Sequence, residues 1–435
     1  MSVKKHWWKD ASIYELYIDK FAGTIANLTT RLDYFEKLGI NALHLLPHYP
    51  SPMVDGGYDV MDYLNVRPEL GTLDDFDALI VAAHEKGIKI IVDFVLNHVS
   101  EHHPWFIEAR SSRHNSKRDY FLWSESGREY AHETNSFPHI KPSNWIRNEP
   151  TGDYYFATFY SEQPDLNWRN EEVVEAMLAH MDFWADRGVD GFRLDATSHL
   201  IKYETKSQDL AATHAILKRL RKHLDTKYGG SIVLLAEAHR QVEEIKTFFG
   251  NGDECHLAYN FPMAEALFDS LMRRDTKPME LMLERSRDIP HSCAWAYFLR
   301  NHDEISFSTV AEEDRAALLH FLDPKRQYLF RHKRDTAVRL GSIFEKEPER
   351  IFDALELLYS LPGAIIMYYG DEIGMRNLPP EDGVLDSRAY VRGDFDWDEA
   401  ERAVQDPSSL WNRISKHVHY SKASPLTRLI LKKPN

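Results

Sequence analysis

Eight short apolar segments recur along the 435-residue chain, separated by stretches with the residue spacing of amphipathic helices. The helical stretches include 28–38, followed by Gly39, and 72–86, which begins at Thr72 and is followed by Gly87. Alternating strands and helices indicate a parallel sheet, and eight strands match the number in a closed (β/α)8 barrel, the TIM-barrel fold. The eight apolar segments are 12–18, 42–47, 89–95, 191–196, 232–237, 256–261, 296–302 and 364–370.

The competing α/β architecture is an open, doubly wound sheet. Such sheets commonly carry a glycine-rich phosphate-binding turn after the first strand, and no such turn occurs in this sequence. The closed barrel is therefore the preferred prediction.

The alternation is interrupted between 100 and 170, a stretch rich in His, Trp, Pro, Ser and Arg with only a weak strand pattern at 154–160. This stretch is too long for a structureless loop, so we expect an inserted B subdomain after the third strand. The expected organisation is a first part of the barrel (1–99), the insertion (100–170), the rest of the barrel (171–375) and a reduced C-terminal segment (376–435). That last segment has one helical pattern, at 408–417, and is too short for a β-sandwich of about 100 residues.

Composition narrows the classes of partner. The net charge of −15 argues against nucleic-acid binding, which needs a basic face. Two cysteines, Cys255 and Cys293, give no disulfide framework, and the first ten residues lack the apolar region of a signal peptide. No apolar run is long enough to span a membrane. We therefore expect a cytoplasmic protein without a membrane or nucleic-acid partner.

Polar side chains follow several of the predicted strands, where a barrel places its chemistry. Each has an ordinary structural explanation; Glu237, for example, could pair with Arg240. Their coincidence at consecutive strand ends favours a functional site. The residues are Asp93, Asn97, His98, Arg193, Asp195, Glu237, Asn301, His302 and Asp303.

Converging carboxylates and histidines are compatible with a metal site or with glycoside chemistry. The HExxH and HxxEH metal motifs are absent. Glycoside cleavage needs one ionised carboxylate and one protonated carboxylic acid. Asp195, next to Arg193, is suited to remain ionised, and Glu237, which follows the apolar run IVLLA, is suited to a raised pKa.

Five motifs resemble those of the α-amylase superfamily, the retaining glycoside hydrolases and transglucosidases of family 13. They are DFVLNH at 93–98, QPDLNW at 163–168, GFRLDATSH at 191–199, LLAEA at 234–238 and RNHDE at 300–304. The resemblance implies that Asp195 is the nucleophile and Glu237 the general acid and base. It also implies that Asp303 binds ring hydroxyls and stabilises the transition state.

The same resemblance implies supporting roles for four further residues. Arg193 would keep Asp195 ionised and oriented, His98 and His302 would hydrogen-bond sugar hydroxyls, and Tyr58 would stack on the innermost sugar. A catalytically inactive relative would typically lack one of the three acids, and all three are present. The chain is therefore expected to be an enzyme.

Two further segments, DGGYDV at 55–60 and DSRAYVRGDFDW at 386–397, resemble those that supply an Asp–Arg pair closing the pocket behind a terminal glucose. The candidates are Asp55 or Asp59 with Arg392 or Arg388. QPDLN is similar to the oligo-1,6-glucosidase, trehalose synthase and amylosucrase branch.

The expected function is therefore an α-glucosidase-like retaining hydrolase that acts on terminal α-glucosyl residues of short sugars. The alternative is an α-glucosyltransferase or isomerase on sucrose, trehalose or maltose. The substrate is in either case a small carbohydrate.

A calcium site of this family could draw on Asn97, Asp165 and the His199 carbonyl. Where trehalose synthases place an acidic ligand, this chain has Lys202, whose ammonium could substitute for the cation. We expect no required metal and no cofactor.

Overall fold

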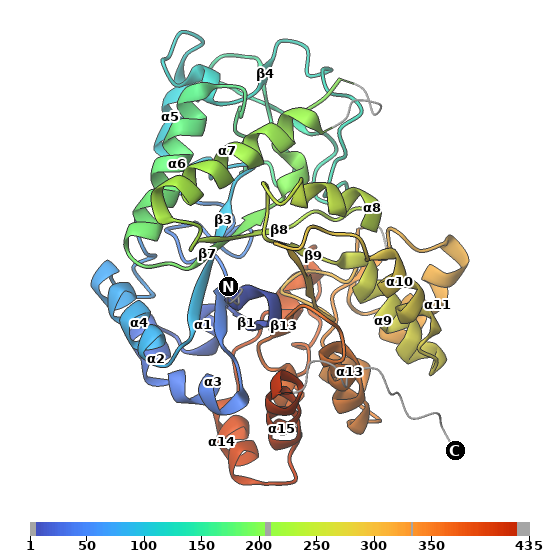
Figure 1. Ribbon diagram of the computed structural model, residues 1–435. Helices are drawn as coiled ribbons and strands as arrows, with labels where there is room; N and C mark the ends of the chain where they lie inside the picture. Colours follow the sequence, from blue (N-terminus) through green and yellow to red (C-terminus); the bar gives the residue numbers. More distant parts are fainter. Residues whose placement is uncertain (1–5, 205–209, 332–333, 424–435) are drawn as a thin grey trace.

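The structure, a computed structural model, describes residues 6–204, 210–331 and 334–423. Eight parallel strands form a closed barrel in the order β1-β13-β10-β9-β8-β7-β3-β2, so the predicted (β/α)8 fold is confirmed (Figure 1). The strands are β1 (Ser12–Leu16), β2 (Ala42–Leu45), β3 (Lys89–Val95), β7 (Gly191–Asp195), β8 (Val233–Ala236), β9 (Leu257–Tyr259), β10 (Ala294–Tyr297) and β13 (Ala364–Tyr368).

The bounds of β10 differ most from the predicted range among the barrel strands. β10 begins at Ala294 and ends at Tyr297, whereas the apolar pattern predicted 296–302. On one side its neighbour β9 ends at Tyr259, which pairs with Ala296, and β9 is followed at once by a helix. Beyond Tyr297 the chain therefore has no β9 partner, and residues 298–302 form an irregular segment over the barrel end.

Helices surround the barrel (Figure 1). The helix α4 begins after Thr72, as predicted, and Thr72 caps it through a reciprocal capping box with Asp75. The helices are α1 (Ile18–Phe21), α2 (Ile25–Thr30), α3 (Leu32–Leu38), α4 (Leu73–Glu85), α5 (Pro104–Ser111), α6 (Glu171–Asp186), α7 (Ala211–Tyr228), α8 (Val242–Ile245), α9 (Phe261–Arg273), α10 (Lys277–Arg285), α11 (Glu312–Leu322), α12 (Leu340–Ile343), α13 (Glu349–Tyr359), α14 (Trp397–Gln405) and α15 (Leu410–Ala423).

The helix predicted at 28–38 is two helices, α2 and α3, divided at Arg31. The Thr29 and Thr30 hydroxyls donate to the carbonyl oxygens of Ile25 and Asn27 in the preceding turn. Such bonds compete with the regular helix pattern and bend the chain.

The insertion between β3 and α6 contains α5 and a three-stranded antiparallel sheet in the order β4-β6-β5. Its strands are β4 (Trp123–Ser124), β5 (Trp145–Arg147) and β6 (Tyr154–Phe156). β6 is shorter than the predicted 154–160, because the Thr158 N–H donates to the Asp165 side chain rather than to a neighbouring strand.

Between β10 and β13 lies a short hairpin, β11 (Leu329–Phe330) and β12 (Asp335–Thr336), that the sequence patterns did not predict. After β13, α14 and α15 pack beside each other, and α15 also packs against α3 and α13. Among the described residues, no helix has both the length and the apolar character needed to cross a membrane.

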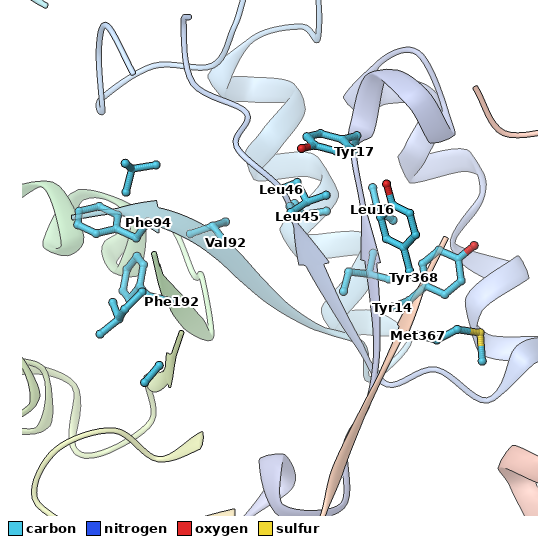
Figure 2. Packing of buried hydrophobic residues seen from close by; sticks show 14 of the residues in the cluster. Tyr14, Leu16, Tyr17, Leu45, Leu46, Val92, Phe94, Phe192, Met367 and Tyr368 are labelled. Atoms are coloured by element: carbon cyan, nitrogen blue, oxygen red, sulfur yellow. The ribbon is translucent and has the colours of Figure 1, made fainter. Parts of the chain in front are cut away.

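The strands alternate between two buried clusters. Outward-facing residues form one cluster with residues of the surrounding helices. Figure 2 shows two of them close together, Phe94 of β3 and Phe192 of β7, and their ring centroids lie 5.4 Å apart. Inward-facing residues form a second cluster that includes Ile13, Ile91 and Val233. On β1, β2, β3 and β7, the inward positions nearer the ends of the strands are polar yet buried: Glu15, His44, Asp93 and Arg193. The barrel interior is thus apolar at one end and charged at the other.

Candidate active site

Arg193 lies at the centre of the charged end of the barrel. Its Nη1 atom is 2.9 Å from Asp93 Oδ1 and 2.7 Å from Asp195 Oδ1, and its Nη2 atom is 2.6 Å from Glu237 Oε1. The side chain is 1% exposed, so these ion pairs replace water around the guanidinium. Burial favours the neutral form of Arg193, but the acids around it, Asp93 first, raise its pKa well above the usual value.

Opposing influences act on the ionisation of Asp195. Burial raises the pKa of Asp195 well above its usual range, and the charges of Glu237, Asp93 and Asp303 raise it further. Arg193 opposes this effect, but one guanidinium is shared among three carboxylates. Arg193 favours the ionised form of Asp195 through their ion pair, and its role in keeping this acid ionised for attack stays a prediction.

Asp303 follows β10 and has a different environment. Its Oδ1 atom is 3.1 Å from Arg388 Nη1 and 2.9 Å from Arg392 Nη2, and its Oδ2 atom is 3.2 Å from His302 Nε2. Although burial opposes ionisation, the charges of His302, Arg388 and Arg392 hold the pKa of Asp303 well below its usual range. Asp303 is therefore a carboxylate at neutral pH.

These acids open into one cavity of about 550 Å³. Asp195, Glu237, Asp303, Tyr58 and His98 all line it, so the predicted catalytic acids share a single space. Further walls come from the insertion and from the loops after the strands: Asn135, Phe137, Phe159, His199, His239, Arg240, Glu304, Arg331 and Arg388.

His98 and Tyr58 present different polar groups to the cavity. Burial lowers the pKa of His98 to about 4, so its ring is neutral near pH 7, and its Nε2 atom has no hydrogen-bond partner among the described residues. The Tyr58 hydroxyl is 2.8 Å from Asp93 Oδ2 and 2.7 Å from His302 Nε2. The Tyr58 hydroxyl is fixed by the protein, and the hydrogen bond between His98 and a sugar hydroxyl stays a prediction.

The structure separates the alternatives for the closing Asp–Arg pair. Arg388 Nη2 is 2.8 Å from Asp55 Oδ1, and both residues line the cavity. Asp59 does not line it; its carboxylate accepts hydrogen bonds from Ser51 and the backbone N–H groups of its own loop. Arg392 contacts Asp303 and the His302 carbonyl instead of Asp55. Of the predicted candidates, Asp55 and Arg388 form an ion pair at the cavity wall, and their role behind a terminal glucose stays a prediction.

Lys202 occupies the position discussed for a cation. Its Nζ atom is 2.7 Å from both Asp165 Oδ2 and Asn97 Oδ1 and also donates to the His199 carbonyl. Burial opposes ionisation of Asp165, but Lys202 lowers its pKa. In the described part of the chain, no group of three His, Cys, Asp or Glu side chains could hold a metal ion. The absence of a required metal stays a prediction.

The strand-end pattern does not mark several residues of this site. Glu15 lies inside the apolar segment SIYELYI, the same signal that identified Asp93 inside KIIVDFV, and could have been found in that way. Phe137 and Arg331 lie in the insertion and the β11–β12 hairpin, where no periodic pattern marks them.

Comparisons with known proteins agree with this geometry. A family model described as alpha amylase, catalytic domain, matches residues 7–323. Trehalose synthase from Thermus thermophilus is 41% identical over 399 residues, which cover 90% of this chain and 40% of that protein. The trehalose synthase/amylase TreS of Mycolicibacterium smegmatis is 39% identical over 406 residues, covering 90% of this chain and 67% of that protein.

Among solved structures, the α-amylase from H. orenii superimposes with a TM-score of 0.76 at 25% identity, covering 96% of this chain and 83% of that one. The chain thus spans two fifths of the length of one curated relative and two thirds of the other. The family model matches residues 7–323, and the two relatives align along 90% of the chain. The chain therefore belongs to the α-amylase family of enzymes, glycoside hydrolase family 13.

Proposed function

We propose that this enzyme transfers an α-glucosyl residue within or between short sugars and forms trehalose. The observation that carries the proposal is the similarity to trehalose synthases at about 40% identity along 90% of the chain. It favours the transferase or isomerase alternative over the α-glucosidase predicted first. Maltose is the proposed donor because it is an isomer of trehalose, so moving its terminal glucosyl group to the other glucose needs no further reactant.

The proposed reaction is a double displacement at the three acids. Asp195 attacks C1 of the donor glucose while Glu237 protonates the departing oxygen, giving a covalent β-glucosyl intermediate. Glu237, now a carboxylate, then removes the proton from an acceptor hydroxyl, which attacks C1 and releases Asp195. Two inversions retain the α configuration.

The contacts of Arg193 support this division of labour. Because Arg193 touches both Asp195 and Glu237, it stabilises negative charge on whichever acid is ionised at each step. Asp303, held ionised by the cations around it, is placed to accept hydrogen bonds from donor hydroxyls and to stabilise positive charge developing at C1.

The Asp55–Arg388 pair is the proposed closed end of the donor site, so that the pocket accepts one terminal glucose. Arg388 also packs over Phe137 at 4.7 Å and bonds Asp386, which holds the pair rigidly. Asp55 and Arg388 would then bind hydroxyls of that glucose equally in the ground and transition states.

Asp55→Asn and Arg388→Lys are each expected to raise KM for maltose by roughly 10-fold to 100-fold, because each leaves a buried polar partner unsatisfied. The value of kcat should change less, since uniform binding is lost. Steady-state kinetics of the two variants and of the double variant check this. If the residues act as one pair, the rise in KM of the double variant should be far smaller than the product of the two single rises. Independent, multiplicative effects would contradict the pairing.

The proposed function is tested with maltose in the presence of free ¹³C-labelled glucose, with products resolved by chromatography and mass spectrometry. Trehalose without the label is expected if the released glucose is retained in the cavity, and labelled trehalose would indicate transfer between molecules. Glucose as the sole product would overturn the proposal in favour of hydrolysis. Sucrose run in parallel separates an amylosucrase-like activity, which would yield glucan.

A further inference from the structure

Glu15 is a buried acid on the inner face of β1, and the proposed reaction does not use it. Its Oε1 atom is 3.0 Å from the His302 backbone nitrogen and 2.9 Å from His302 Nδ1. Its Oε2 atom is 3.2 Å from the Tyr259 hydroxyl and 3.3 Å from His44 Nδ1. Each oxygen thus faces two donors, the arrangement of an ionised carboxylate that only accepts hydrogen bonds.

The hydrogen bonds around His302 determine where its protons lie. With Glu15 ionised, His302 Nδ1 must carry a hydrogen and donate it. On the other side, Nε2 lies 2.7 Å from the Tyr58 hydroxyl, whose single hydrogen is required by the Asp93 carboxylate at 2.8 Å. The Tyr58 oxygen can therefore only accept from His302, so Nε2 also carries a hydrogen.

We propose that Glu15 is a positioning residue of the active site: its carboxylate holds the His302 ring as an imidazolium whose Nε2–H is directed at Tyr58 and Asp303. The arrangement follows the logic of carboxylate–histidine pairs, in which the acid fixes both the orientation and the protonation of the ring. Through His302, Glu15 fixes the carboxylate of Asp303 and the hydroxyl of Tyr58, both of which line the cavity.

Through His44, the Glu15 carboxylate is also linked to the side of the site that contains Asp195 and Glu237. His44 lies between Glu15 and Asp93, with its Nε2 atom 3.3 Å from Asp93 Oδ2. Asp93 in turn holds Arg193, which contacts Asp195 and Glu237. Glu15 therefore joins the Asp303 side of the cavity to the side of the two other acids.

The electrostatics agree with this geometry. Burial lowers the pKa of His302, but the charges of Asp303 and Glu15 overcome it and raise the pKa to about 9. His302 carries both ring protons below pH about 9 and loses one of them as the pH rises through that value. The titratable and charged groups around His302, and around its partners Glu15 and Tyr58, come from several elements. They are Glu15 and Tyr17 at the end of β1, His44, Tyr58, Asp93, Arg193, Tyr259, Asp303 and Arg392.

The first test is the ionisation of His302 in the wild-type enzyme. NMR of protein labelled with ¹⁵N-histidine would identify the His302 signals by their loss in His302→Gln. Both ring nitrogens should be protonated at pH 7 and titrate near pH 9. A neutral ring at pH 7 would overturn the proposal without any variant of Glu15.

Glu15→Gln removes the charge at nearly constant volume. We expect the His302 titration to fall by at least two pH units and the alkaline limb of kcat to move with it. The value of kcat at pH 7 should fall roughly 10-fold to 100-fold, with a smaller change in KM. Glu15→Asp, which keeps the charge, should restore the titration toward that of the wild type. An unchanged His302 titration in folded Glu15→Gln would overturn the proposal.

The matched control is Glu372→Gln, which neutralises another buried acid in the barrel region. The described hydrogen bonds of Glu372 come from the Tyr14 and Tyr34 hydroxyls, each at 2.6 Å, rather than from His302. This variant should leave the His302 titration unchanged; a shift equal to that of Glu15→Gln would count against a specific role. The effect on turnover rests on the proposed function, whereas the NMR titration does not, so failure of one is distinguishable from failure of the other.

Discussion

Asp195→Asn is expected to reduce glucosyl transfer from maltose by at least about 10⁴-fold, because an amide cannot form the covalent intermediate. The variant should fold, since Asn is nearly isosteric and the Arg193 guanidinium keeps its ion pairs with Asp93 and Glu237. The measurement is the initial rate of trehalose and glucose formation, with folding checked by circular dichroism.

The control for this variant is Asp323→Asn, a buried acid that caps the backbone N–H groups of Gln327 and Tyr328. It should lower stability and leave the rate per folded molecule near that of the wild type. Asp195→Ala adds a positive test with α-glucosyl fluoride and azide. Azide in the vacated space should attack C1 as fluoride leaves and give β-glucosyl azide. Wild-type activity in Asp195→Asn, or an α-azide product, would refute the nucleophile assignment.

Lys202→Ala is expected to destabilise the protein by about 3–5 kcal/mol, the cost of breaking a buried ion pair by removing one partner. Asp165 is fully buried and would be left with hydrogen bonds from Thr158 but no cation. Urea denaturation followed by fluorescence gives the free energy of unfolding. Since Asp165 belongs to the insertion and Lys202 follows β7, the first region to unfold should be their junction.

A second variant distinguishes the effect of leaving Asp165 without its cation from the effect of losing the Lys202 side chain. Lys202→Met combined with Asp165→Asn removes both charges and should recover a large part of the lost stability. In Lys202→Ala, millimolar calcium should partly restore stability through Asp165, Asn97 and the His199 carbonyl, whereas EDTA should not affect the wild type. A loss below about 1 kcal/mol in Lys202→Ala would mean that the ion pair contributes little net stability.

Much of the barrel was predictable because its strands bury both faces. Apolar runs such as KIIVDFV are explained by two clusters of neighbours, and an acid within such a run signals the charged end of the interior. The positions of Asp195, Glu237 and Asp303 followed from the same reasoning, since parallel strands bring their carboxyl ends to one rim.

The remaining features depend on contacts that the local sequence does not encode. The break at Arg31 comes from two threonine hydroxyls that bond back to carbonyl oxygens, and the end of β10 is set by where its neighbour β9 stops. The choice of Arg388 over Arg392 depends on how the segment after β13 approaches Asp55. The sharing of Arg193 among three acids likewise became visible only once the strands were placed together.

The closure of the barrel between β1 and β13 has a consequence for biosynthesis. Ser12 pairs with Ile365, so the barrel's first strand finds one of its two neighbours only when the barrel's last strand has been made. Contacts between such distant residues carry a high loop-closure entropy and form late. Glu15 lies in that first strand and bonds His302 after β10, so the charged interior is assembled with the barrel. A nascent chain that stops before β13 would therefore be inactive, and synthesis itself would time the onset of catalysis.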